Sequence, residues 1–341
     1  MKLRLDAQAL ERLPEPAEIP MAITEFNAGF NKLCSLPPSL TTYRNLRTLH
    51  LNHNLFEDLP EELATLTELR ELNLSSNPLR CFPRVLLRMP HLEVLHLDQT
   101  SLEEIPAEFQ PGALVHLSLA RNKIASIPDT LFSQGSSLRV LRLQQNRLKE
   151  LPASMAGLDA IEELDLSYNE LESLPDELGQ LKRLKLLDLQ GNRLRTLPRT
   201  VGQLTALLRL TLHENQLTAL PDSIGQLAAL ERLDASHNAL RSLPEAIDGW
   251  RAMRWLVLSE NQLTSLPVGF CRLSALTHCF LHQNQLSNLP SEGCNEILPV
   301  LQTLSLSDNA FPKDWKPPVA YGRLFKSPNN SPRDGVCPAS V

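Results

Sequence analysis

The sequence predicts an α/β fold, a solenoid of about fourteen stacked units that each contribute one short strand to a parallel sheet. Three observations predict it: one frame of residues, LxxLxLxxNxLxxLP, recurs along the chain, its spacing is nearly constant, and its leucines alternate with polar residues. The frame is centred on an asparagine at Asn31, Asn54, Asn77, Asn122, Asn146, Asn169, Asn192, Asn215, Asn238, Asn261, Asn284 and Asn309. Gln8 and Thr100 hold the same position in two degenerate copies, which makes fourteen frames.

The spacing of the frames identifies the kind of solenoid. Successive frames lie 23 residues apart almost throughout, with spacings of 22 and 24 on either side of Asn122 and of 25 before Asn309. A repeat of this length with this leucine pattern is typical of a leucine-rich repeat solenoid. We therefore expect a horseshoe with a parallel sheet on its concave side.

The residues just before each frame asparagine are expected to form the strand. Side chains alternate between the two faces of a strand, so the leucines of the LxL motif point into the core and their neighbours point outward. In the copy centred on Asn54, Leu49 and Leu51 belong to the core, whereas His50 and His53 belong to the exposed surface. The outward residues of all copies then line the concave face.

The asparagine and the residues after it complete the unit. The asparagine amide supplies donors and an acceptor to backbone groups that would otherwise be buried without partners, and neighbouring copies should form an asparagine ladder. Thr100 keeps a hydroxyl but loses reach, so we expect its unit to be looser. On the opposite side, Pro175 stands at a first helical position and is followed by Leu178 and Leu181, spaced by three. This spacing predicts a short helical or 3₁₀ turn on the convex side.

These units resemble the 23-residue leucine-rich repeats of intracellular scaffolds, namely the Sur-type Ras-pathway scaffolds, the plant Ras-group repeat proteins and the Erbin/Scribble class. The segment LPDELGQLKRLKLLDLQGNRLRTLP, residues 174–198, is a clear example of their unit, and the resemblance covers about residues 3–311. The resemblance implies an intracellular protein-binding solenoid whose partner is a small GTPase, a kinase or a phosphatase. The matching positions are structural, so they do not identify the partner.

The pattern divides the chain into three parts. We expect a solenoid at residues 1–311, a C-terminal cap at 312–326 and a disordered tail at 327–341, which is rich in Pro, Ser and Asn. The cap prediction rests on three aromatic residues: Phe311, Trp315 and Tyr321. Ser327 and Ser331 each precede a proline and are candidate phosphorylation sites, although Ser and Pro also belong to the ordinary composition of an unstructured tail.

The N-terminal end of the solenoid carries its own alternatives. The chain enters a strand directly, at LRLDAQALERLP, and an uncovered strand exposes backbone groups and apolar surface. We expect a self-sufficient short cap and therefore a monomer; the alternative is an edge-paired dimer through the N-terminal repeat.

Composition and charge exclude several classes of function. The net charge is −6, from 33 basic and 39 acidic residues, without a basic block, so nucleic acid is a poor partner. The sequence shows no signal peptide and no apolar run of about 18 residues, so we expect a cytoplasmic protein without a membrane span. No CxxC pairs occur, and we expect reduced thiols rather than a zinc site or a disulfide framework. The six cysteines are Cys34, Cys81, Cys271, Cys279, Cys294 and Cys337.

Eight of the nine histidines fall at concave positions, which raises the question of a metal or acid–base site. They are His50, His53, His96, His116, His213, His237, His278 and His282. Strands stack about 4.8 Å apart, so His213 and His237, in adjacent repeats, are the closest pair, and no third ligand stands beside them. The neighbouring carboxylates Asp165 and Asp188 lack a pocket that would desolvate them. No phosphate-binding glycine loop is present. We therefore expect no metal, no cofactor and no catalytic residues.

A cluster in the C-terminal half of the concave face is the candidate partner-binding site. It consists of Arg209, Arg232, Asp234, Trp255, Val257 and Phe280, which the repeat places on neighbouring strands. Trp and Arg are enriched among the residues that dominate interface energies. The alternative is that Arg232 stacks on Trp255 within the free protein, a cation–π contact of ~0.5–1 kcal/mol, with no partner involved.

The predicted function is that of a non-catalytic scaffold or adaptor, which binds a folded protein partner on its concave face in intracellular signalling. The alternative is a regulatory or substrate-recognition subunit of an enzyme complex, of the ubiquitin-ligase, phosphatase or bacterial-effector type.

Overall fold

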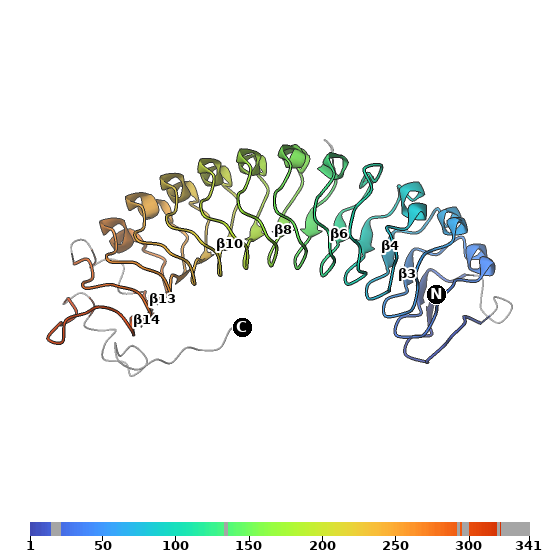
Figure 1. Ribbon diagram of the computed structural model, residues 1–341, viewed down its shortest axis with the longest axis horizontal. Coiled ribbons are helices and arrows are strands. Elements are labelled where there is room, and N and C mark those ends of the chain that lie inside the picture. The colour runs from blue at the N-terminus through green and yellow to red at the C-terminus, as the bar shows by residue number, and fades with distance from the viewer. Residues whose placement is uncertain (15–21, 133–135, 292–293, 295–299, 319–320, 322–341) are drawn as a thin grey trace. The chain divides into compact units, whose positions relative to one another are not determined.

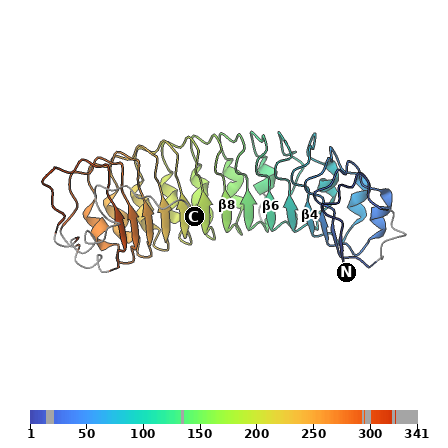
Figure 2. The same cartoon turned by 90° about the horizontal axis from the view of Figure 1, so that it is seen from below.

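The computed structural model forms two compact units, Met1–Glu170 and Leu171–Val341, each a stack of strand-and-turn repeats in chain order (Figure 1). Figure 2 shows the strands of each unit lying side by side. The structure describes residues 1–14, 22–132, 136–291, 294, 300–318 and 321.

The first unit contains eight strands among its described residues, each paired in parallel with its neighbours. They are β1 (Lys2–Arg4), β2 (Glu25–Asn27), β3 (Thr48–His50), β4 (Glu71–Asn73), β5 (Val94–His96), β6 (His116–Ser118), β7 (Val140–Arg142) and β8 (Glu163–Asp165). Short 3₁₀ turns connect them: η2 (Pro38–Thr42), η3 (Glu61–Thr65), η4 (Arg84–Arg88), η5 (Asp129–Phe132) and η6 (Ala153–Gly157).

The second unit repeats this plan with six described strands, again parallel. They are β9 (Leu186–Asp188), β10 (Arg209–Thr211), β11 (Arg232–Asp234), β12 (Trp255–Val257), β13 (His278–Phe280) and β14 (Thr303–Ser305). The turns are η7 (Asp176–Gln180), η8 (Arg199–Gln203), η9 (Asp222–Gln226), η10 (Glu245–Gly249) and η11 (Val268–Arg272).

The predicted fold class is confirmed. The fourteen strands of the described chain correspond one to one to the fourteen frames, and in each unit they line the concave side while the 3₁₀ turns lie on the convex side (Figure 1). Leu49 and Leu51, the LxL leucines of the frame at Asn54, are fully buried, as alternation along a strand requires.

The convex turns begin one residue later than the sequence predicts. Pro175 is the N-cap of η7, with φ −70° and ψ 152°, and does not occupy the first helical position. Its carbonyl accepts the Leu178 N–H at 3.1 Å, and the Leu178 carbonyl accepts the Leu181 N–H at 3.1 Å. Bonds between residues three apart define a 3₁₀ turn, in which side chains three apart lie on one face. Leu178 and Leu181 are therefore both buried.

The frame asparagines join each repeat to the one before it. Asn54 Oδ1 accepts the N–H of Leu33 at 2.9 Å, and Nδ2 donates to the carbonyls of Ala28 at 2.9 Å and Leu51 at 3.0 Å. Asn77, Asn146 and Asn284 are bonded in the same way, so the expected ladder runs through the backbone. Thr100 makes no such bond to the preceding repeat among the described residues; its hydroxyl donates to its own repeat at Leu97, as its shorter reach predicts.

The residue before each frame position has a left-handed backbone. Its φ lies between 50° and 65° in all fourteen described repeats, although only one of these residues, Gly191, is a glycine. A left-handed conformation is costly for residues with a Cβ and is normally a glycine position. The repeat geometry therefore imposes this conformation on larger side chains, such as Phe30 and Tyr168, which it leaves exposed.

One cysteine pair corrects the sequence-based expectation of reduced thiols. Cys271 and Cys294 form a disulfide, with their Cα atoms 4.4 Å apart. The two residues are separated by 23 positions, which is one repeat, so stacking places them side by side. Cys34 and Cys81 are free and exposed, whereas Cys279 is free and buried.

The described part of the expected cap contacts the last repeats of the second unit. The Trp315 ring packs against Phe311 in a tilted arrangement with a centroid distance of 4.2 Å, and its Nε1 donates to Asn288 Oδ1 at 3.3 Å. Tyr321 is fully buried, and its hydroxyl donates to the Pro290 carbonyl at 3.0 Å. The predicted tail, including Ser327 and Ser331, lies outside the described residues.

Candidate protein-binding surface

The six residues of the candidate site lie together on the concave face of the second unit. Along the first residues of β10, β11 and β12, Arg209 pairs with Arg232, and Arg232 with Trp255. Along the last residues of β11, β12 and β13, Asp234 pairs with Val257, and Val257 with Phe280. The repeat pattern therefore placed these residues correctly relative to one another.

Trp255 is the centre of a stacked column. The Arg232 guanidinium carbon lies 5.5 Å from the Trp255 ring centroid, and on the other side the His278 ring stacks at 4.2 Å and 19°. Phe280 contributes a third ring at 5.5 Å from Trp255. The cation–π contact that the sequence offered as an alternative is present. The sequence prediction omitted His278, although it follows Trp255 at the same position of the next repeat.

Exposure differs among the six residues. Arg209 is exposed, and Arg232, Asp234, Trp255 and Val257 are half-buried. Phe280 is buried, with 7% of its surface exposed, because the Trp255 ring packs beside it. Phe280 therefore supports the Trp255 ring more than it presents a surface of its own.

Asp234 has a structural task that the sequence did not suggest. Its Oδ1 accepts both the backbone N–H of Ser236 at 3.1 Å and the Ser236 hydroxyl at 2.5 Å. The side chains of the last residues of other strands accept the same backbone N–H, two residues on. The pairs are Asn27 with Gly29, Asn73 with Ser75, Asp165 with Ser167 and Asp188 with Gln190. An Asn or Asp here bonds its own backbone two residues on and shapes the bend after the strand.

The two arginines of the cluster lack an ion pair. Neither Arg209 nor Arg232 lies within 4 Å of a carboxylate oxygen in the described chain. Arg142 on β7 shows the usual arrangement: its Nε and Nη2 donate to Glu163 Oε1 at 3.0 and 2.9 Å. Strand β8 supplies a carboxylate to Arg142. Strand β11 instead places Arg232 opposite Arg209, and its carboxylate, Asp234, is bonded to Ser236.

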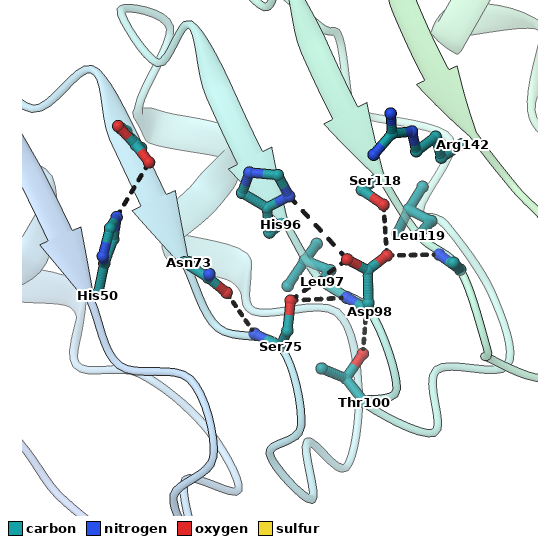
Figure 3. A network of polar contacts seen from close by, with 12 residues as sticks. His50, Asn73, Ser75, His96, Leu97, Asp98, Thr100, Ser118, Leu119 and Arg142 are labelled. Carbon is teal, nitrogen blue, oxygen red and sulfur yellow. Dashed lines mark hydrogen bonds and ion pairs between the residues drawn. The ribbon is translucent and has the colours of Figure 1, made fainter. Parts of the chain in front are cut away.

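The first unit carries a polar network on its own concave face, centred on Asp98 (Figure 3). Strand β6 ends in Ser118 and so lacks the Asn or Asp that would accept the N–H of Ala120. Asp98 Oδ1, from the preceding repeat, accepts this N–H at 2.8 Å and also the Ser118 hydroxyl. Ser75 donates to Asp98 Oδ2 at 3.4 Å. Asp98 is therefore a structural acceptor between repeats.

Two histidines beside this network, His96 and His116, are partly buried. The His96 and His116 rings lie 4.9 Å apart. Burial lowers the pKa of both; the charge of His96 lowers the pKa of His116 further, whereas Asp98 opposes the shift at His96. His50 Nε2 lies 2.9 Å from Glu71 Oε1. His213 and His237, the pair that the repeat map places closest, have ring centroids 4.6 Å apart. No group of three His, Cys, Asp or Glu residues that could hold a metal ion occurs in the described part of the chain.

Two further findings concern the buried thiol of Cys279 and the length of the helical segments. Burial raises the pKa of the Cys279 thiol far above its ordinary value, so this cysteine stays protonated and is a poor nucleophile. None of the helical segments that the structure describes is both long and apolar enough to traverse a lipid bilayer.

Comparison with protein-family models finds leucine-rich repeats along much of the chain. A model described as "Leucine-rich repeat region" matches residues 161–242, and one described as "Leucine rich repeat" matches 44–102 and 112–171. Among curated proteins, the chain is 36% identical to osteomodulin of Bos taurus over 56 residues, which are 16% of this chain and 13% of osteomodulin. The chain thus spans a small part of that relative.

Solved structures of similar fold include bacterial and plant proteins. A leucine-rich repeat protein of Leptospira interrogans has a TM-score of 0.67 at 29% identity, with 96% of this chain and 94% of that chain covered. The plant peptide hormone receptor RGFR1, in complex with RGF2, has a TM-score of 0.68 at 30% identity, with 84% and 51% covered. An internalin of Listeria monocytogenes, at 23% identity and a TM-score of 0.72 over 94% and 88%, shares the fold.

Proposed function

Because the chain is a leucine-rich repeat protein, we propose that it is a non-catalytic scaffold or adaptor that binds a folded protein partner on its concave face. The observation that carries this proposal is the column of Arg232, Trp255 and His278 beside the unpaired Arg209. Stacking fixes these side chains before any partner binds, so binding loses less side-chain conformational entropy. Trp and Arg are also the side chains that most often dominate interface energies.

The finer part of the proposal is a role in intracellular signalling. It is supported by the resemblance of the repeats to those of Ras-pathway scaffolds, which makes a small GTPase, a kinase or a phosphatase the partner to look for. The cytoplasmic location has the same support. The Cys271–Cys294 disulfide counts against it, because disulfides persist mainly in oxidising compartments. Cell fractionation with thiol trapping decides between the cytoplasm and an oxidising compartment.

We also propose that the protein is a monomer in solution. Light scattering on the purified chain tests this, and a dimer that dissociates when the exposed Arg4 of β1 is replaced by Pro would establish pairing through the N-terminal repeat instead.

The experiment that tests the proposed function compares capture by the wild-type chain with capture by Arg209→Ala/Trp255→Ala. Partners identified by mass spectrometry are purified and their binding is measured directly, with circular dichroism as the folding check. Arg199→Ala/Val268→Ala is a matched control, because both side chains are exposed on the convex turns. The site variant should bind at least about tenfold more weakly, and the control should bind normally.

Two results would change the proposal. Equal binding by the site variant and wild type would remove the concave cluster as the site. Stoichiometric co-purification with one catalytic subunit would favour the alternative of a regulatory or substrate-recognition subunit.

A further inference from the structure

The arginine–tryptophan patch, defined as Arg209, Arg232, Trp255 and Val257, carries two positive charges that form no ion pair with any residue the structure describes. Arg209 and Arg232 pair in register on adjacent parallel strands, which are about 4.8 Å apart. Like charges placed directly opposite each other across strands are unfavourable. Two carboxylates flank Arg232 in the sequence, Glu231 and Asp234, and neither makes an ion pair with Arg209 or Arg232 within the described chain. Asp234 Oδ1 is engaged with Ser236.

The patch is also prepared to donate hydrogen bonds. Contact with the Trp255 ring holds the Arg232 guanidinium in place without consuming its N–H donors. Two neighbouring guanidinium groups suit one carboxylate, which accepts bidentate hydrogen bonds from arginine. In the first unit, Arg142 at the end of β7 obtains its carboxylate from Glu163 at the start of β8. Arg209 and Arg232 have no such carboxylate partner among the described residues, so a partner's carboxylate would bind between them.

Beyond the arginines the patch becomes apolar. Trp255 and Val257 lie on β12, and Phe280 supports them from β13. A carboxylate bound between Arg209 and Arg232 would lie midway between β10 and β11. Strand β12 is one and a half strand spacings from that point, about 7 Å, and β13 is two and a half spacings away, about 12 Å. An extended chain advances about 3.4 Å per residue and presents every second side chain to one face. A segment crossing the strands therefore meets the patch with residues i and i+2, and the neighbouring strand β13 with residue i+4.

Building on the proposed function, we propose that this patch recognises an extended acidic segment of a partner protein with Asp or Glu at i and apolar side chains at i+2 and i+4. The carboxylate binds between Arg209 and Arg232. The first apolar side chain lies on Trp255 and Val257, and the second lies over β13, beside His278 and Phe280. Charge complementarity and the strand spacing together select this partner chemistry.

The test is selection from a display library of random nine-residue peptides against the immobilised full chain. Selection is repeated on Arg209→Gln/Arg232→Gln, which removes the charge without reversing it, and on Trp255→Ala. The matched control is Arg199→Gln/Arg251→Gln, which removes two exposed arginines from the convex side. Selected peptides are then synthesised with a fluorescent label, and binding is measured by fluorescence polarisation at low and high salt.

We expect wild type and the control to select peptides with Asp or Glu two residues before an apolar residue. Arg209→Gln/Arg232→Gln should bind these peptides about tenfold more weakly and with less salt dependence. Trp255→Ala should lose the preference at i+2 while it keeps the preference for the acidic residue.

Three outcomes would overturn the assignment. Selected peptides that need Trp255 but carry no acidic residue would refute the partner chemistry and leave the concave site intact. Peptides that bind both arginine and tryptophan variants as well as wild type would place the binding elsewhere, against the proposed function too. A wild-type dimer that Arg209→Gln/Arg232→Gln converts to a monomer would assign the patch to a second copy of this chain.

Discussion

Replacing Asn261 by alanine tests how the repeats are held together. The buried Asn261 side chain accepts the N–H of Leu240 at 2.9 Å and donates to the carbonyls of Ala235 at 2.9 Å and Leu258 at 3.2 Å. Both carbonyls keep a second partner, because Asn238 donates to Ala235 and Asn284 donates to Leu258. The Leu240 N–H has no second acceptor among the bonds of the described chain.

The expected cost follows from this difference. An orphaned buried N–H costs about 1–3 kcal/mol, and each bond lost by a carbonyl that keeps a partner costs about 0.5 kcal/mol or more. We therefore expect the Asn261→Ala variant to be less stable by about 2–4 kcal/mol. Chemical denaturation measures the loss, and hydrogen exchange should show faster exchange at the Leu240 amide. Thr264→Ala is the control, since Thr264 is exposed on the same repeat.

A loss below about 0.5 kcal/mol, which is the scale of an ordinary surface substitution, would refute this account of the asparagines. So would a loss confined to Asn261→Ala without any change in exchange at Leu240, because the energy would then come from some other contact.

Three more predictions concern packing, pH and thiols. Gly225→Ala should cost about 1–3 kcal/mol in thermal or chemical denaturation, because a Cβ there would overlap the Ala246 carbonyl of the next turn. The folded-state pKa of His96 and of His116 is lowered, so the unfolded chain binds more protons near pH 6 and stability should fall as pH falls below about 6.5. A double substitution by Gln should reduce this dependence in pH-resolved denaturation and leave the part that His278 and His282 contribute through their own lowered pKa. Thiol titration of the denatured chain should find two fewer thiols before reduction than after, through Cys271 and Cys294; an equal count would show that the pair is reduced.

Much of the fold was predictable because the spacing of residues within each frame determines which side chains face the core. Side-chain alternation in a strand is fixed at two residues, so the positions of Leu49 and His50 relative to the core followed from spacing alone. The same spacing gave the columns that bring Arg232 beside Trp255.

Other features carry no compositional signal. The left-handed residue before each frame position is Phe30, Tyr168 or Glu214 as readily as Gly191, because the stacked repeats impose its φ. The 23-residue separation of Cys271 and Cys294 was visible, but it becomes meaningful only once the two positions are known to face each other. Asp98 accepts the Ala120 N–H because Ser118, at the end of the next strand, has no Asn or Asp side chain to do so. This role becomes visible only when two neighbouring repeats are compared.

The last residues of the strands link stability to binding. In the described strands this column is polar except at the adjacent residues Val257 and Phe280. Where it carries Asn or Asp, the side chain bonds the backbone two residues on, as in Asp234 with Ser236. Val257, which lies on the same strand as Trp255, cannot form this side-chain bond to the backbone. Departures from a repeated local pattern are expected at functional sites.

Val257→Asn should therefore separate the two properties. The new amide restores the backbone bond to Ser259, worth about 0.5–1.5 kcal/mol, which offsets the lost apolar contact, so stability should stay within about 0.5 kcal/mol of wild type. Binding of the selected peptides should weaken, because the first apolar side chain loses its contact with Val257 and keeps only the one with Trp255. His50→Asn makes the same change at the end of β3, outside the patch, and should leave binding unaltered. If Val257→Asn bound as well as wild type, Val257 would be apolar for a reason other than partner recognition.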